Sequence, residues 1–116
     1  MKYIRLYSGD DGEAHFEDLE MPLQDRGRST RTSQMEKAVG IIFRETGGDF
    51  VADWHNAPRR QYIFILEGEV EVEVGDGTKR RFGPGDIQLI EDTTGRGHIT
   101  RSVNNQPWKA VFIPLE

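Results

Sequence analysis

The sequence contains no cysteine, which excludes disulfides, thiolate metal ligands and a cysteine nucleophile together. It has no apolar run long enough to span a membrane, and residues 1–5 lack the apolar core of a signal peptide. No serine lies in a nucleophile-elbow motif, and there is no glycine-rich phosphate loop. We therefore expect a cytoplasmic protein without membrane contact, and neither nucleophilic catalysis nor nucleotide binding is indicated.

The sequence also lacks a basic stripe of the kind that binds nucleic acid, and its net charge is −5. An acidic excess of this size favours solubility and indicates no particular macromolecular partner. The length of 116 residues is typical of one domain with one core. We expect a small-molecule ligand and no nucleic acid.

Glycine is what the sequence has in abundance. Thirteen glycines and five prolines divide it into short segments, as in an all-β domain. In the segment 68–82, valines alternate with glutamates, and Asp76-Gly77 provides the turn of a hairpin. No segment shows helical periodicity. Further strands are predicted at 16–23, 39–43, 50–51, 62–66, 87–90, 99–103 and 108–113.

The segment 54–98 resembles the paired motifs of the cupin superfamily. The first motif runs His, any residue, His, a short gap, Glu, six residues, Gly. His55 matches the first histidine and Gly68 the closing glycine. Gln61 stands in the place of the glutamate, and Ala57 stands in the place of the second histidine.

The second cupin motif runs Gly, a gap, Pro, any residue, Gly, two residues, His, three residues, Asn. Gly85, Gly95 and His98 match it, whereas Thr93 replaces the proline and Ser102 replaces the asparagine. The resemblance implies one jelly-roll barrel, a double-stranded β-helix, over residues 1–116. Its parts are an N-terminal strand and loop arm at 1–35, a barrel at 36–116, motif 1 at 55–68 and motif 2 at 85–102.

The resemblance also implies a divalent metal, since the motif ligands of cupins hold iron, manganese, nickel or zinc inside the barrel. Here the ligands would be His55, Gln61 and His98, one ligand and one negative charge fewer than usual. Three neutral ligands hold a metal more loosely. The alternative is that the two histidines are held by hydrogen bonds, with the glutamine between them and no metal. Both interpretations stay open.

Strand parity suggests which other side chains line a pocket. Alternate residues of the strand that begins at Gln61 face one side, and alternate residues after His98 share its side. Arg59 and Arg60 lie at the mouth, where one of them would grip a substrate carboxylate or, the interpretation we favour, form a surface salt bridge. The candidate pocket residues are Arg59, Ile63, Ile65, Thr100 and Ser102.

Two aromatic residues and one acid have open roles. Trp54 or Trp108 would pack against a planar ligand or, more commonly, in the core or at the rim. Asp92 would cap the turn before His98 or orient a base, and we favour the turn role. His15 lies in an acidic segment away from the motifs, and we expect no role for it in a site.

Three functions from different classes follow. The first is a metal-dependent enzyme, a dioxygenase, isomerase or lyase, acting on a small polar organic substrate. The second is a metal-free module that binds or senses a small molecule. The third is a metal-free isomerase or epimerase with a histidine base. We also expect a homodimer, in which the segment Lys2–Tyr7 adds to the partner's sheet.

Overall fold

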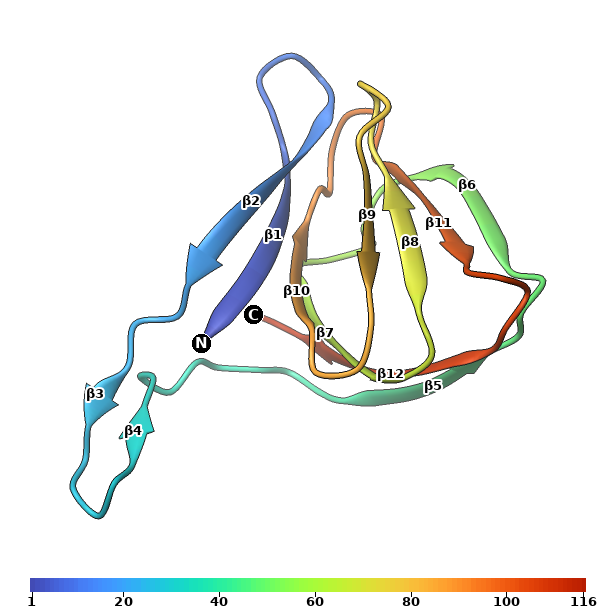
Figure 1. Ribbon diagram of the computed structural model, residues 1–116. Helices are drawn as coiled ribbons and strands as arrows, with labels where there is room; N and C mark the ends of the chain where they lie inside the picture. Colours follow the sequence, from blue (N-terminus) through green and yellow to red (C-terminus); the bar gives the residue numbers. More distant parts are fainter.

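The computed structural model describes residues 1–116 as an all-β chain without a helix, so no helix is present that would cross a membrane. The prediction of an all-β fold is confirmed. Figure 1 shows the twelve strands, which are β1 Lys2–Ser8, β2 Ala14–Glu20, β3 Gln24–Asp25, β4 Arg31–Thr32, β5 Ile42–Thr46, β6 Val51–His55, β7 Gln61–Glu67, β8 Val70–Glu73, β9 Lys79–Phe82, β10 Ile87–Glu91, β11 His98–Ser102 and β12 Trp108–Pro114.

Two sheets face each other and form the barrel (Figure 1). One has six strands in the order β2-β1-β10-β7-β12-β5, and the other has four strands in the order β6-β11-β8-β9. Because neighbours in a sheet are often distant in sequence, strands from both motifs come to lie across the same interior. The short pair β3-β4 forms a separate two-stranded ribbon.

The hairpin β8–β9 forms where the alternation predicts it. Val70, Val72 and Val74 are at most 3% exposed, because their side of the strand faces the opposite sheet. Gly77 has a φ of 89° in the turn, a conformation that side chains disfavour. On the outer face, Arg81 Nε lies 3.2 Å from a carboxylate oxygen of Glu71.

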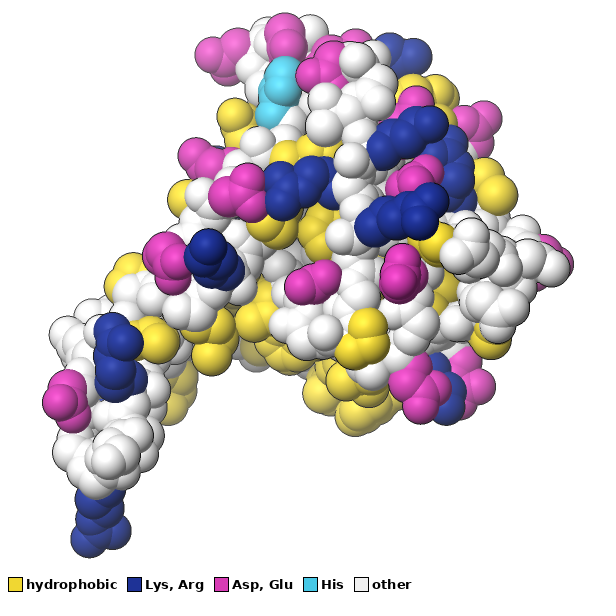
Figure 2. All heavy atoms as spheres, in the orientation of Figure 1, with side chains coloured by type: hydrophobic (Ala, Val, Ile, Leu, Met, Phe, Trp, Pro, Cys, Tyr) yellow, Lys and Arg dark blue, Asp and Glu magenta, His cyan; other side chains and the backbone are white.

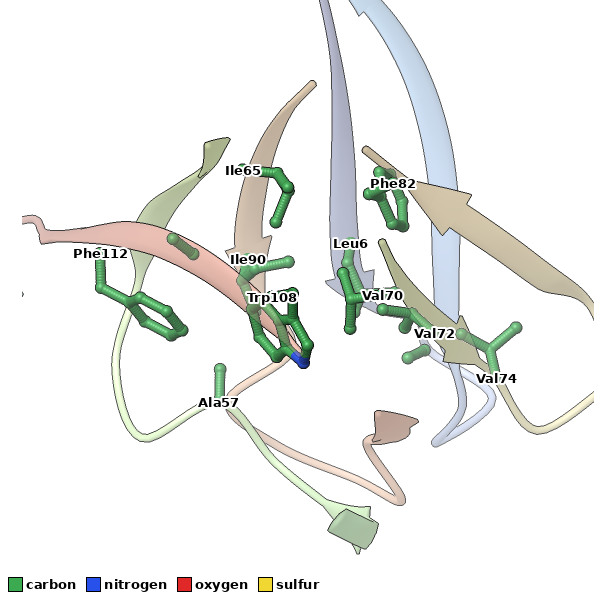
Figure 3. Close-up of a cluster of buried hydrophobic side chains, with 12 residues drawn as sticks. Leu6, Ala57, Ile65, Val70, Val72, Val74, Phe82, Ile90, Trp108 and Phe112 are labelled. Atoms are coloured by element: carbon green, nitrogen blue, oxygen red, sulfur yellow. The ribbon is translucent and has the colours of Figure 1, made fainter. Parts of the chain in front are cut away.

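The core is one cluster of twelve buried hydrophobic residues drawn from both sheets. Figure 3 shows their side chains converging between the strands, with Trp108 and Phe112 extending from β12. Burial of a side chain such as Leu6 or Ile65 stabilises the fold by roughly 1.5–3 kcal/mol. The core fills one part of the space between the sheets, and a cavity occupies another part.

The N-terminal residues extend the barrel. β1 pairs in parallel with β10 and antiparallel with β2, so both of its edges are used within its own chain. The expectation that Lys2–Tyr7 adds to a partner's sheet is therefore wrong. The homodimer itself stays a prediction, which light scattering tests. β5 is one of the two edge strands of the six-stranded sheet, and its Phe43 is 74% exposed.

The segment 21–41 stands apart from the barrel. It carries the ribbon β3–β4, and nearly all of its side chains are exposed. Figures 1 and 2 show this segment projecting from the rest of the molecule. It returns to the barrel where Ala38 bridges Leu115 and the Val39 N–H donates to the Pro114 carbonyl.

Candidate functional site

A cavity of about 400 Å³ lies inside the barrel, and its lining residues come from both sheets. Ten of the eighteen lining residues are hydrophobic, so the wall suits an apolar body with a few polar contacts. No aspartate or glutamate is among them. The polar lining residues are Arg44, His55, Arg59, Gln61, Gln88, His98 and Thr100.

Two histidines face each other across neighbouring strands of the cavity wall. His55 in β6 is the register partner of His98 in β11, and their ring centroids are 4.4 Å apart. Gly97 permits this approach, since a Cβ at that position would lie 1.9 Å from the His55 carbonyl oxygen. Its φ of 77° also favours glycine. The glycine before His98 in the sequence thus brings the two strands close enough for the rings to meet.

Each imidazole is oriented by an oxygen atom behind it. Nδ1 of His55 lies 2.7 Å from the Asp53 carbonyl oxygen, which only accepts, so we assign the proton to Nδ1. Nδ1 of His98 lies against a carboxylate oxygen of Asp92, which is 0% exposed. We assign a proton to that nitrogen too. Nε2 of each ring is consequently the nitrogen without a protein partner.

Asp92 orients His98, which differs from the turn role favoured by the sequence. The loop that carries it is fixed by Asn56, whose side-chain nitrogen donates to the carbonyls of Thr94 at 2.9 Å and Gly95 at 3.0 Å. The same nitrogen lies 3.3 Å from the Asp92 carbonyl oxygen. Sequence reasoning missed Asn56, and only its position directly after His55 pointed to it.

Two glutamines add polar atoms that have no protein partner. Gln61 in β7 is 5% exposed and Gln88 in β10 is 3% exposed, and both line the cavity. The side-chain oxygen of Gln61 and the side-chain nitrogen of Gln88 are buried without a hydrogen bond. An unsatisfied buried polar group costs about 1–3 kcal/mol. A ligand that supplies the missing hydrogen bonds would recover part of that cost. Gln88 was not predicted, although it is the one polar residue inside an apolar strand.

Of the predicted pocket residues, Arg59, Ile63 and Thr100 line the cavity. Ile65 and Ser102 do not. Ile65 packs in the core cluster, two residues beyond Ile63. The hydroxyl of Ser102 donates to the Gly47 carbonyl at 2.7 Å and accepts from the Trp108 indole at 3.2 Å.

The structure shows which of the other residues with open roles line the cavity and which lie outside it. Arg60 pairs with Glu91 outside the cavity, as a surface salt bridge, whereas Arg59 has no such partner. Trp108 lines the cavity. Trp54 lies outside the lining, with the guanidinium carbon of Arg96 at 4.1 Å from its ring. His15 pairs with an exposed aspartate, away from the cavity.

The donors present fit a divalent metal only as a neutral set. Nε2 of His55, Nε2 of His98 and the unpartnered oxygen of Gln61 suit borderline ions. A metal-binding imidazole commonly donates its other N–H to a carboxylate or carbonyl, as both rings do here. No group of three or more histidine, cysteine, aspartate or glutamate side chains is placed to hold a metal. A bound ion would therefore depend on the amide oxygen.

A comparison with protein families shows to which family the chain belongs. A profile of the Cupin domain family matches residues 42–114, more than half of the chain. The chain belongs to the cupin family. The predicted resemblance is thereby confirmed, and the profile covers nearly all of the strands that surround the cavity. No curated protein matches the sequence.

Solved structures with the same fold confirm the jelly-roll barrel. A cupin 2 conserved barrel domain protein from Salinispora arenicola has a TM-score of 0.53 and 13% identity, over 66% of this chain and 61% of that one. The match thus spans less than two thirds of that protein. A Neisseria meningitidis protein has a TM-score of 0.52 and 18% identity, over 76% of this cupin and 90% of that chain.

A third structure covers nearly the whole cupin chain. It is a Salmonella typhimurium protein proposed to act in ethanolamine utilization, with a TM-score of 0.53 and 12% identity, over 99% of this chain and 95% of that one. At these identities the likeness concerns the fold alone, because folds of this kind host many chemistries.

Proposed function

We propose that this cupin binds a small organic molecule in the barrel cavity. The observation that carries the proposal is the pair of buried glutamine atoms without partners in an otherwise largely apolar wall. An apolar body would pack against the hydrophobic lining, and one or two polar groups would bond to Gln61 and Gln88. Binding would thus be driven by apolar burial and directed by a small number of hydrogen bonds.

The chemistry that we propose for the bound molecule is proton transfer to His98. Nε2 of His98 has a free lone pair in the assigned tautomer, and it would accept a proton from a ligand carbon or hydroxyl group. The buried carboxylate of Asp92 would stabilise the positive charge that then forms on the ring. Return of that proton to another atom of the ligand would complete an isomerisation, and return to the same carbon from its opposite face would complete an epimerisation.

A divalent metal is the second candidate, favoured by the unpartnered oxygen of Gln61 in the same cavity as two imidazoles whose Nδ1 atoms are both engaged. His55, Gln61 and His98 would hold it. Such an ion supplies a Lewis acid that polarises a bound oxygen. The two candidates compete, since a metal on Nε2 of His98 would use the lone pair that a base requires.

Metal titration separates the two candidates. Protein purified without a chelating column would be titrated with manganese, iron, nickel and zinc by calorimetry, alongside His55→Ala and His98→Ala. Binding near one ion per chain that both substitutions abolish would favour the metal. Absence of binding, or binding that both variants retain, would rule it out. Gln61→Glu serves as the gain-of-charge variant, and it should tighten a genuine site.

Ligand binding itself is tested by nuclear magnetic resonance with phenylacetamide, phenylacetate and benzyl alcohol. We expect at least one probe to shift the amide signals of cavity residues. Ala52→Phe, which fills the cavity from β6, should abolish these shifts. Val51→Phe is the matched control, since Val51 is 63% exposed on the same strand. If no probe shifts a cavity signal, or if Ala52→Phe leaves the shifts unchanged, the proposed function is wrong.

A further inference from the structure

The cavity carries positive charge in a protein whose net charge is −5. Its charged lining residues are Arg44 and Arg59, and no aspartate or glutamate lines it. Asp92, whose carboxylate contacts Nδ1 of His98, does not line the cavity. An anion entering the cavity would meet two guanidinium groups and no lining carboxylate.

These two arginines differ from the others of the barrel. Neither the Arg44 nor the Arg59 side chain forms an ion pair or a hydrogen bond, although carboxylates are plentiful on the outer surface. Within the barrel, the arginines that face outward have carboxylate partners, and the two that line the cavity do not. The barrel arginines that each pair with a carboxylate are Arg5, Arg60, Arg80, Arg81, Arg96 and Arg101.

Arg44 is the better placed of the two to hold a ligand. It is half-buried in β5, and its guanidinium carbon lies 5.1 Å from the ring centroids of Phe50 and Phe112 and 5.6 Å from that of Trp108. Ring faces attract the cation but do not satisfy the N–H donors in the guanidinium plane. That planar fork matches a carboxylate, which accepts two parallel hydrogen bonds.

We propose that the ligand of this cavity is an organic acid whose carboxylate binds Arg44 and whose apolar body packs against Phe50, Trp108 and Phe112. The proposal rests on the proposed binding function and specifies its ligand class. Arg59 is exposed at the cavity, so solvent screens it, and its contribution is to attract anions toward the opening. Neutral and cationic molecules of the same shape would bind more weakly.

The test compares two matched pairs of probes, phenylacetate with phenylacetamide and hexanoate with hexanamide. Dissociation constants would be measured in the parent protein by nuclear magnetic resonance titration, following the amide signals of cavity residues. We expect each acid to bind about tenfold or more tightly than its amide, the ratio given by charge-assisted hydrogen bonds. Phenethylamine, a cation of similar shape, should bind least.

Substitutions test whether Arg44 is the residue that causes the preference for acids over amides. Arg44→Gln should reduce the acid-to-amide ratio to within about twofold, and Arg44→Lys, which keeps the charge but loses the planar fork, should give an intermediate ratio. Arg31→Gln, the same change on an exposed arginine outside the cavity, should leave the ratio unchanged. Circular dichroism would check that the variants fold. The comparison of acids with amides in the parent protein tests the ligand class even if a variant does not fold.

The outcomes distinguish the two proposals. Amides that bind as tightly as acids would overturn the ligand class while leaving the binding function intact. A preference for acids that survives in folded Arg44→Gln would overturn the role of Arg44. If neither acids nor amides shift any cavity signal, both the binding function and the ligand class are wrong.

Discussion

Charged side chains on the outer face of the four-stranded sheet are paired with one another, whereas several charged and polar side chains in the cavity behind it lack partners. On the outer face, Arg101 lies 2.9 Å from carboxylate oxygens of both Glu71 and Glu73, and Arg81 also pairs with Glu71. Figure 2 shows acidic and basic side chains mixed over the surface. In the cavity, Arg44 has no carboxylate and two glutamine atoms have no partner. On the outer face of this sheet these charged side chains pair with one another, whereas the cavity leaves polar groups without a partner for a ligand to bind.

The largest expected effect comes from breaking the one buried pair at the cavity. Asp92→Ala should lower the free energy of unfolding by about 3 kcal/mol, because it removes one member of a buried, hydrogen-bonded pair. Glu71→Gln is the surface counterpart and should cost about 1 kcal/mol or less, since solvent reaches both of its arginine partners and screens the two pairs. Urea unfolding followed by fluorescence measures both. Equal costs for the two variants would contradict the difference between the two regions.

A smaller loss of stability is expected from a substitution that disturbs the close approach of the two strands that carry the histidines. Gly97→Ala would place a Cβ against the His55 backbone, and we expect it to destabilise the fold by roughly 1–3 kcal/mol more than Gly77→Ala. Gly77 is the matched control because it also has positive φ, but a Cβ there meets nothing within 4 Å. Thermal unfolding measures the difference. Similar melting temperatures for the two variants would show that the close approach imposes no steric limit.

The smallest effect concerns the pH dependence of the outer ion pairs. Burial alone would raise the pKa of Glu91, but hydrogen bonds from Arg5 and Arg60 outweigh it and hold that pKa below its usual value. A carboxyl with a lowered folded pKa stabilises the fold above the unfolded pKa of about 4.3, and this contribution is lost as pH falls through the folded value.

Glu91→Gln should therefore cost about 1 kcal/mol or less at pH 7, and less at pH 3 than at pH 7. Urea unfolding of parent and variant at both pH values gives the difference, and other carboxyls cancel in the comparison. A variant that costs as much at pH 3 as at pH 7 would contradict the assignment. Half-molar salt should weaken the effect, since both arginines are partly exposed.

The amino-acid sequence by itself determined the all-β fold and the cupin relationship. Glycine-separated segments and the alternation in 68–82 are local signals, so they do not depend on where the rest of the chain goes. The same holds for the motif positions of His55, Gln61 and His98, which all line the cavity. Whether these three bind a metal stays a prediction.

Only the tertiary structure decided which residues share the cavity and which find partners elsewhere. The alternation of side chains indicates which face of a strand a residue is on, but not how far along the strand the cavity extends. Ile65 and Ser102 accordingly lie outside the lining. Asp92 reaches His98, and Arg44 joins three aromatic rings, because strands distant in sequence are neighbours in space. The ion pair of Arg81 with Glu71 follows from the local hairpin, whereas the absence of a carboxylate partner for Arg44 depends on long-range packing.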